Sequence, residues 1–196
     1  MIHEDEEGEE AFISPDSVPA DWARQLLGFW FDEHGRDDWF GGGPAFDEKA
    51  ARFADWRTAL RSLPASHFLA DADTARAAIV LFDQVPRNLY RGSAEAFATD
   101  ELAVQIARGA VEKAYDAGLD DDARALLYMP FEHSEDIEDQ RESVRLMNSI
   151  NAQYGDYAQR HFVIIDQFGR FPHRNAALGR ADRPGEEEAI EQGKNW

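Results

Sequence analysis

The sequence predicts an all-α fold, an array or bundle of about seven to nine helices paired as antiparallel hairpins. Successive segments place apolar residues three and four positions apart, which is the spacing of one face of a helix. No segment shows the strict alternation of apolar and polar residues that indicates a half-buried strand. The connections between the helical segments are mostly short, and short connections favour antiparallel neighbours.

The first two helices are predicted from aromatic residues at helical spacing. One helix covers residues 21–31, where the spaced residues are Trp22, Leu26, Phe29 and Trp30. A loop follows over residues 32–43, whose glycines at 41–43 form a turn before Pro44 opens the second helix. Pro64 ends that helix. Its inner face carries Phe46, Ala50, Phe53, Trp56, Leu60 and Leu63.

Two helices are predicted for the middle of the chain. Thr74 is expected to cap the third helix, which runs to about Val85. Residues 79–82 are apolar on every side of this helix, so it is expected to lie centrally. Thr99 starts the fourth helix, with acidic residues in its first turn, and Gly118 closes it.

Three further helices and a final turn are predicted after these. The fifth helix is short, begins near residue 121 and stops at Pro130. Ser134 caps a long sixth helix that runs to about Tyr154. The seventh helix covers residues 156–168 and ends at Gly169. A short helical turn lies between Pro172 and Gly179.

One helical domain is expected over residues 17–180. Residues 1–16 form an acidic tail, which is expected to be disordered because its like charges cannot bury apolar surface. Residues 181–196 form a polar C-terminal extension, which is expected to be frayed.

The formal net charge of −19 excludes some partners. Such a field repels nucleic acid and anionic membranes, so neither is expected as a partner. The longest apolar run, residues 77–82, is too short to span a bilayer, and the N-terminus shows no secretory signal pattern. A cytoplasmic location is therefore expected. The absence of cysteine excludes disulfides, thiolate zinc sites and a cysteine nucleophile.

One pattern of residues occurs twice in the chain. The apolar run and Asp–Gln pair of residues 79–84 recur at residues 162–167, and the Pro–Arg–Asn of residues 86–88 is echoed at residues 172–175. The repetition indicates one local geometry used twice. An aspartate directly after four apolar residues is expected to be at least partly buried and to need a partner. Asp83 and Asp166 each have an arginine four positions further on, so ion pairs that hold the corners of the fold are one interpretation.

The arginines near both copies form a candidate ligand site. If the two corners meet, several guanidinium groups line one positive pocket, and guanidinium forks match carboxylates and phosphates. An anionic small molecule or a peptide carboxylate is the expected ligand. The predicted ligand-binding residues are Asp83, Arg87, Asn88, Arg91, Glu135, Arg170, His173, Arg174 and Asn175. In the opposite interpretation, carboxylates of the protein neutralise these arginines and leave none for a ligand.

A second polar cluster, residues 128–136, is predicted on a loop at a helix N-terminus, where backbone N–H groups and the helix dipole attract anions. Ser134, Glu135 and Asp136 have a structural explanation as caps. Glu132 and His133 do not, and a histidine beside a carboxylate is a candidate acid–base pair or ligand. Glu132 and His133 are therefore the predicted catalytic residues.

No metal site and no cofactor are predicted. The sequence contains no H-E-x-x-H and no Glu-x-x-His of the di-iron type. It also contains no G-x-S-x-G elbow, which leaves a serine hydrolase without support.

Several long motifs carry a family resemblance. The longest are F-D-Q-V-P-R-N-L-Y-R-G (82–92), Y-M-P-F-E-H-S-E-D (128–136) with Gln140, and F-G-R-F-P-H-R-N-A-A-L-G-R (168–180). The shorter ones are L-G-F-W-F (27–31), D-W-F-G (38–41) and A-F-A-T-D (96–100). Through these motifs, residues 21–190 resemble the bacterial domain-of-unknown-function family 924. The resemblance implies a tetratricopeptide-like helical fold and supplies no reaction.

Three functions are compatible with the sequence. The leading hypothesis is a helical protein with a polar Arg/His/carboxylate pocket that binds an anionic ligand. The second is an interaction scaffold of tetratricopeptide type, which requires a broad groove with apolar anchors. The third is a hydrolase or transferase that uses Glu132 and His133 as an acid–base pair. The first hypothesis requires the three longest motifs to converge on one pocket.

Overall fold

The structure of the protein is a computed structural model that describes residues 13–41 and 43–193. The described residues form helices and no strand, which confirms the predicted all-α fold. Residues 1–12 of the predicted acidic tail and residues 194–196 of the predicted extension lie outside the described residues. No helix in the described part of the chain is long and apolar enough to cross a membrane.

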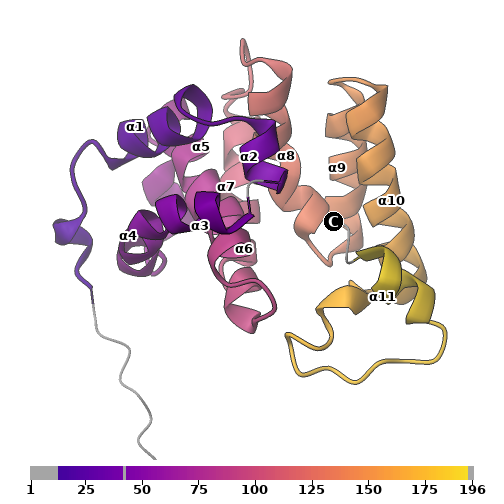
Figure 1. The fold of residues 1–196 in the computed structure, drawn as a ribbon. Helices are drawn as coiled ribbons and strands as arrows, with labels where there is room; N and C mark the ends of the chain where they lie inside the picture. Colours follow the sequence, from indigo (N-terminus) through magenta and orange to yellow (C-terminus); the bar gives the residue numbers. More distant parts are fainter. Residues whose placement is uncertain (1–12, 42, 194–196) are drawn as a thin grey trace, which may run out of the picture.

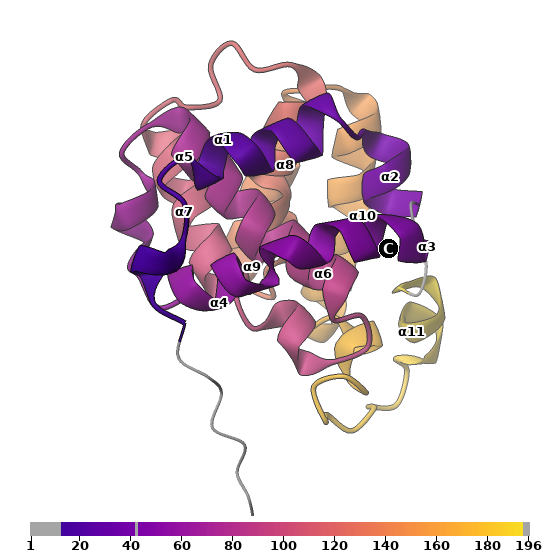
Figure 2. The ribbon, with the colours of Figure 1, turned by 60° about the vertical axis from the view of Figure 1, so that its left-hand side comes forward.

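The helices pack as two groups that meet along α8 (Asp121–His133), as Figures 1 and 2 show. In the C-terminal group, α9 (Ile137–Asn148) packs against both α8 and α10 (Ala152–Phe168). In the N-terminal group, α5 packs against α1 and α7, and α3 packs against α6. The helices of this group are α1 (Trp22–Leu27), α2 (Arg36–Gly41), α3 (Gly43–Ala50), α4 (Ala54–Leu60), α5 (Ala72–Ile79), α6 (Val85–Leu89) and α7 (Asp100–Glu112).

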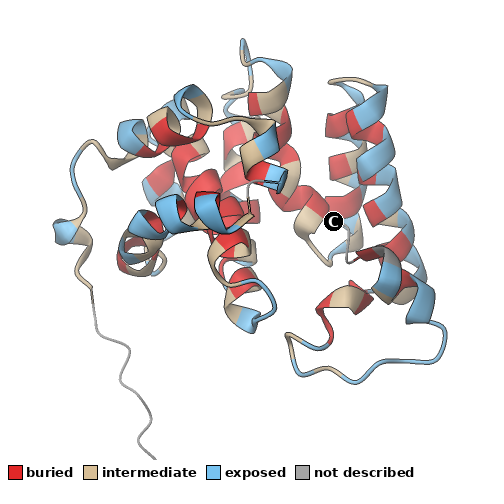
Figure 3. Ribbon diagram, in the orientation of Figure 1, coloured by how far each residue is buried: buried red, intermediate tan, exposed pale blue. Residues whose placement is uncertain are grey.

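Aromatic side chains fill the core of the N-terminal group, where Figure 3 shows the buried helix faces turned toward one another. The rings of Phe29 and Trp30 contact the ring of Phe46 at centroid distances of 5.6 and 5.3 Å. Trp39 is also buried, and its indole N–H donates to the Trp30 carbonyl at 2.8 Å. Trp39 belongs to α2, so the loop predicted over residues 32–43 is wrong for residues 36–41. Burial of this indole ties the segment to the core.

The start of the central helix differs from the prediction. Asp71 caps α5 by accepting a hydrogen bond from the Thr74 backbone N–H at 2.8 Å, so Thr74 is not the cap. The cap therefore lies three residues earlier than expected, where an aspartate in extended conformation is available.

The central helix also continues past its predicted end. A π-helical turn (Val80–Gln84) joins α5 directly to α6, which contains Pro86 in its first turn. Proline has no N–H to donate to the Phe82 carbonyl four residues earlier, and the Thr99 hydroxyl donates to that carbonyl instead, at 2.6 Å. The widened turn thus passes the proline without a break. It leaves Asp83 completely buried in the middle of the protein.

The end of α8 changes the setting of the second polar cluster. Pro130 lies inside α8 rather than ending it, and the helix continues to His133. Asp136, not Ser134, caps α9 by accepting from the Glu138 backbone N–H at 2.7 Å. Glu132 and His133 are therefore helical residues in the last turn of α8, not loop residues.

Three other helix ends follow local chemistry. The predicted sixth helix does not reach Tyr154, because Asn151 has an extended backbone and caps α10 through its side chain. α7 ends at Glu112, before the predicted stop at Gly118. Gly169 ends α10 in the left-handed conformation with φ 67°, as predicted.

The prediction of a frayed C-terminal extension is wrong for residues 186–193. Helix α11 (Glu187–Gly193) packs against the 3₁₀ turn Pro172–Arg174. Glu186 is fully buried, and its carboxylate accepts two hydrogen bonds from the Arg170 guanidinium at 2.8 Å each. The bidentate pair is the geometry in which a buried carboxylate is stabilised.

Candidate functional site

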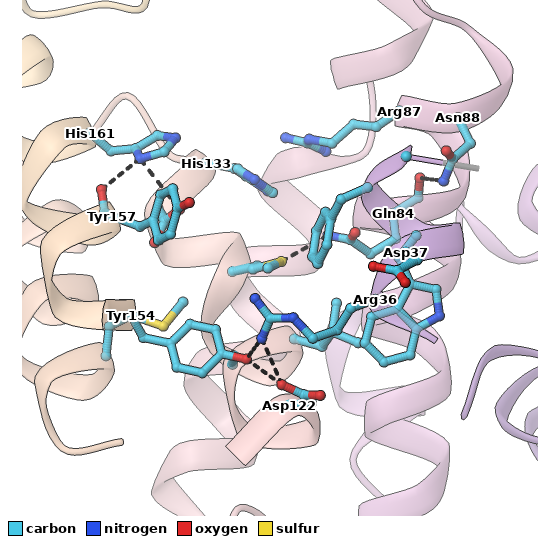
Figure 4. A pocket seen from close by; sticks show the side chains of 18 of the residues that line it. Arg36, Asp37, Gln84, Arg87, Asn88, Asp122, His133, Tyr154, Tyr157 and His161 are labelled. Atoms are coloured by element: carbon cyan, nitrogen blue, oxygen red, sulfur yellow. Dashed lines mark hydrogen bonds and ion pairs between the residues drawn. The ribbon is translucent and has the colours of Figure 1, made fainter. Parts of the chain in front are cut away.

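A cavity of about 950 Å³ lies between the two groups of helices. Figure 4 shows side chains of α2, α6, α8 and α10 facing it. Its size is at the upper end of the range of small-molecule sites, about 300–1,000 Å³. The polar and charged residues that line it are Arg36, Asp37, Gln84, Arg87, Asn88, Arg91, Asp122, Glu132, His133, Tyr154, Tyr157 and His161. The apolar ones are Trp39, Phe40, Ala125, Leu126, Met129 and Met147.

Three helical stripes of residues produce this lining, because residues three and four apart share one helix face. The first stripe runs from just before α6 to just after it and contains Gln84, Arg87, Asn88 and Arg91. The second is Asp122, Ala125, Leu126, Met129, Glu132 and His133 on α8. The third is Tyr154, Tyr157 and His161 on α10. The motifs of residues 82–92 and 128–136 therefore reach the same cavity.

Asp83 and His133 form the central pair of the site. The His133 Nδ1 lies 2.7 and 3.0 Å from the two carboxylate oxygens of Asp83. Asp83 also accepts hydrogen bonds from the Gln84 amide at 2.6 Å, and its carboxylate lies 3.2 Å from the Arg87 guanidinium. Although burial opposes ionisation, Arg87 and His133 lower the pKa of Asp83 to about 2. Asp83 is therefore ionised, and the prediction that it is buried and paired with Arg87 is confirmed.

An ionised carboxylate only accepts hydrogen bonds, so Nδ1 of His133 must carry the proton in this pair. Burial and the nearby Arg87 charge lower the pKa of His133 below its ordinary value of 6.5. At neutral pH the ring is therefore neutral, with its lone pair on Nε2. His133 lines the cavity, as Figure 4 shows. Its Nε2 is the ring nitrogen that Asp83 does not contact.

Glu132 lines the same cavity in the opposite protonation state. Its carboxyl is buried, and burial followed by repulsion from Asp83 raises its pKa to about 8. The carboxyl is thus protonated at neutral pH. His161 Nδ1 lies 3.3 Å from a carboxyl oxygen of Glu132 and 3.0 Å from the Tyr157 carbonyl oxygen. Burial lowers the pKa of His161 to about 3, so this imidazole is neutral.

The arginines that line the cavity are each held by carboxylates of the protein. Arg87 donates two hydrogen bonds of 2.9 Å to the carboxylate of Asp100. Arg91 pairs with Asp47 on α3. Arg36 of α2 pairs with Asp122 at 2.8 Å, and both contact the Tyr154 hydroxyl. Of the arginines predicted to line one pocket, Arg87 and Arg91 line this cavity, whereas Arg170 and Arg174 do not. Arg36 lines it without having been predicted, and each of the three cavity arginines has a counter-charge.

The third motif, residues 168–180, does not line the cavity, so the prediction that the three longest motifs converge on one pocket is wrong for this motif. Arg174 is buried and pairs with Asp100 at 3.2 Å. Asp100 in turn holds Arg87, which lies against Asp83. A chain of alternating charges therefore runs from Arg174 through Asp100, Arg87 and Asp83 to His133. The motif contributes to the position of the His133 ring without touching the cavity.

The other predicted residues of this motif have structural contacts. Glu135 accepts from the Phe171 backbone N–H at 2.7 Å and pairs with Arg180 at 2.8 Å. Asn175 donates to Glu186, the partner of Arg170, at 2.9 Å. His173 is half-buried beside Phe171, and burial lowers its pKa to about 4. For Arg170, Glu135 and Asn175, the interpretation as contacts that hold the corner fits the structure better than a binding role.

The two copies of the repeated pattern do not share one geometry. Asp83 is buried, whereas Asp166 is exposed on the outer face of α10, so the prediction that both are buried is wrong for Asp166. Gly169 ends the helix in the second copy, and Arg170 turns to Glu186 instead of Asp166. The first copy has no glycine at this point, and its helix continues.

Gln140 fixes the end of α8 that carries Glu132 and His133. It is fully buried, and its side-chain amide donates to the carbonyl oxygens of Glu132 and Ser134 at 2.7 Å each. The Glu132 carbonyl belongs to the last turn of α8, where carbonyls have no partner within the helix, and Ser134 is the C-cap residue that follows. The amide thus keeps the catalytic candidates in a helical turn.

Comparison with known proteins gives a family and no activity. The family profile described as bacterial protein of unknown function (DUF924) matches residues 26–194. The fold is similar to the solved structure of a protein of unknown function from Agrobacterium tumefaciens, with 36% identity and a TM-score of 0.82 over 89% of this chain and 99% of that chain. A search of curated proteins gave no significant match.

Proposed function

This chain belongs to the DUF924 family of bacterial proteins, and from its cavity we propose that it is a hydrolase that cleaves a small amide or ester by general acid–base catalysis. One observation carries the proposal. A neutral histidine positioned by a buried aspartate and a protonated glutamate, adjacent on α8, line one cavity. Environments that drive the pKa values of neighbouring groups apart are typical of acid–base sites.

His133 is the proposed base. Its Nε2 takes a proton from a water molecule as the water oxygen attacks the carbonyl carbon of the substrate. The positive charge that develops on the imidazole is stabilised by the Asp83 carboxylate at 2.7 Å from Nδ1. Water is the proposed nucleophile because no serine, threonine or cysteine is among the described residues that line the cavity.

Glu132 is the proposed acid. Its carboxyl donates a proton to the departing nitrogen or oxygen as the bond to the carbonyl carbon breaks. The products are a carboxylic acid and an amine or alcohol. His133 then releases the proton that it took from water, and Glu132 takes up a proton from solvent, so both groups return to their starting protonation states.

The rate is expected to depend on pH in a bell shape. Protonation of His133 abolishes the base on the acid side, below a pKa that lies under 6.5. Ionisation of Glu132 abolishes the acid on the alkaline side, above a pKa of about 8. Activity is therefore expected to be maximal between these values.

His133→Asn tests the proposal. An asparagine amide still reaches toward Asp83 but cannot accept a proton, so hydrolysis of acyl 4-nitroanilides and 4-nitrophenyl esters is expected to fall by about 10² to 10⁴-fold. The measurement is release of the coloured product across a series of acyl groups. His67→Asn, on an exposed histidine in the N-terminal group, is the control and is expected to keep full activity. Equal rates in the two variants would refute the proposal.

Anion binding is a second candidate function, because Arg36, Arg87 and Arg91 all line the cavity. Each arginine is neutralised, so an anion has to compete with a carboxylate of the protein. Arg91 is the most accessible of the three, with 55% of its side chain exposed. An anion that replaces Asp47 as the partner of Arg91 therefore loses the least free energy, because exposed ion pairs are weak. The scaffold of tetratricopeptide type is supported less, because charged and polar side chains stand at both ends of the cavity and its apolar residues are confined to the part between them.

A further inference from the structure

We infer that the ligand of this cavity is a small amphiphile: an amide or ester whose reacting group carries a short unbranched acyl chain. The inference rests on the proposed function for the place of the reacting group and names the substrate class of the same site. The observation behind it is a separation of polar and apolar walls along the cavity.

The stripe on α8 shows the separation most directly. Asp122 stands at one end of the stripe, and Glu132 and His133 stand at the other. A helix rises 1.5 Å per residue, so the two polar ends are about 16 Å apart. Every lining residue between them on this helix is apolar: Ala125, Leu126 and Met129.

The neighbouring helices also place polar residues at the two ends of the cavity. On α10, Tyr154 contacts Asp122 at one end, and His161 lies 3.3 Å from Glu132 at the other. Figure 4 shows Arg36, Asp122 and Tyr154 together, away from Arg87 and His133. Met147 of α9 is only 1% exposed and adds a second thioether to the apolar middle.

The apolar middle gives water few partners and gives an alkyl chain good ones. The Met129 sulfur meets one polar group, the Gln84 amide at 3.3 Å, and thioethers adapt to the shape of a flexible chain. Burial of each methylene group is expected to tighten binding by about fourfold. A chain that extends from a head group at His133 toward Asp122 lies along this wall. The Arg36–Asp122 pair stands at the far end, so a chain long enough to reach it meets charged groups and gains no further apolar contact.

The two ends also distinguish an acyl chain from a fully polar ligand. The middle of a fully polar ligand would lie against Leu126, Ala125 and the methionines. Each polar group of the ligand left there without a hydrogen-bond partner costs free energy. An amide or ester head instead meets Asn88, Glu132 and His133, which offer donors and acceptors. The cavity therefore selects for a polar group at one end of an apolar chain.

The test is calorimetric titration of the protein with butanamide, hexanamide and octanamide. We expect affinity to rise by about fourfold per methylene until the chain reaches the Arg36 end. Met129→Gln places an amide in the middle of the wall and is expected to abolish most of this increase. Met129→Leu keeps the wall apolar and is the matched control, expected to retain it. Met129 is half-buried, and an unfolding curve for each variant verifies that both fold.

Two results overturn the inference: affinities that do not change with chain length in the unmodified protein, or an equal increase in Met129→Gln and Met129→Leu. The same titration in His133→Asn separates this inference from the proposed function. A retained dependence on chain length together with unchanged hydrolysis in that variant supports the amphiphile and refutes the role of His133. Hexanoate in place of hexanamide tests the second candidate, because tighter binding of the anion supports a role for the arginines.

Discussion

Asp83→Asn is expected to destabilise the protein by about 3 kcal/mol, the cost of breaking a buried ion pair from one side. Asp83 is completely buried, and its carboxylate contacts His133, Gln84 and Arg87. An asparagine has the same shape but brings an N–H₂ group to donors and removes the charge that faces Arg87. The free energy of unfolding is measured by urea denaturation at neutral pH.

Asp122→Asn is the matched control for this substitution. It makes the same chemical change at a residue that lines the cavity, in a pair with Arg36 in which the side chains of Asp122 and Arg36 are 42% and 40% exposed. Its expected cost is below about 1 kcal/mol, because exposed ion pairs contribute little. Equal losses of unfolding free energy in the two variants would show that burial of the Asp83 ion pair does not increase its contribution to stability.

The effect of Asp83→Asn also depends on pH with a definite sign. The pKa of Asp83 is depressed from 3.8 to about 2 in the folded protein. Such a group stabilises the protein fully above its unfolded pKa, and the contribution is lost as the pH falls through the folded pKa. The difference between the unmodified protein and the variant is therefore expected to shrink between pH 3.8 and about 2.

Glu132→Gln is expected to stabilise the protein at alkaline pH. The pKa of Glu132 rises from 4.5 to about 8 on burial, so the folded protein holds a proton that the unfolded chain releases. The stability contributed by the protonated Glu132 carboxyl is fully present below pH 4.5 and is lost as the pH rises toward about 8. Glutamine resembles the protonated carboxyl at every pH. The gain is thus near zero below pH 4.5 and reaches the order of a few kcal/mol above pH 8.

Unfolding curves recorded about one pH unit apart, from pH 4 to pH 9, measure this gain in stability. Glu138→Gln is the control. Glu138 is on α9 with 72% of its side chain exposed, so its substitution is expected to leave stability nearly unchanged. A gain that does not grow with pH would contradict the protonated state of Glu132. A gain that grows with pH fits the proposed role of Glu132 as an acid, because functional groups are often retained at a cost in stability.

The sequence predicts a site residue correctly where its local pattern alone determines its surroundings. An aspartate after four apolar residues predicts burial, and Asp83 is buried against Arg87. The same rule was wrong for Asp166, because α10 is covered on one side only and this residue lies on its outer face. Which face of a helix is covered depends on the packing of the two helical groups, and the local sequence does not contain that information.

The residues that sequence reasoning missed share this cause. Arg36, Tyr154 and Tyr157 line the cavity, yet the sequence predicts a loop or an ordinary helix at these positions. A retrospective signal exists for α10, since Tyr154, Tyr157 and His161 follow helical spacing and place polar tips on one stripe. The last turn of α8 is not predicted from the sequence, because a proline usually ends a helix and Pro130 instead lies inside this one.

The most direct test of the account is the protonation state of His133. A two-bond ¹⁵N–¹H correlation spectrum of protein labelled with ¹⁵N-histidine distinguishes the two tautomers and the imidazolium, and His133→Asn assigns the signal. We expect a neutral ring at neutral pH, with the proton on Nδ1 held by Asp83 and with Nε2 unprotonated. A proton on Nε2, or a charged ring at that pH, would contradict it.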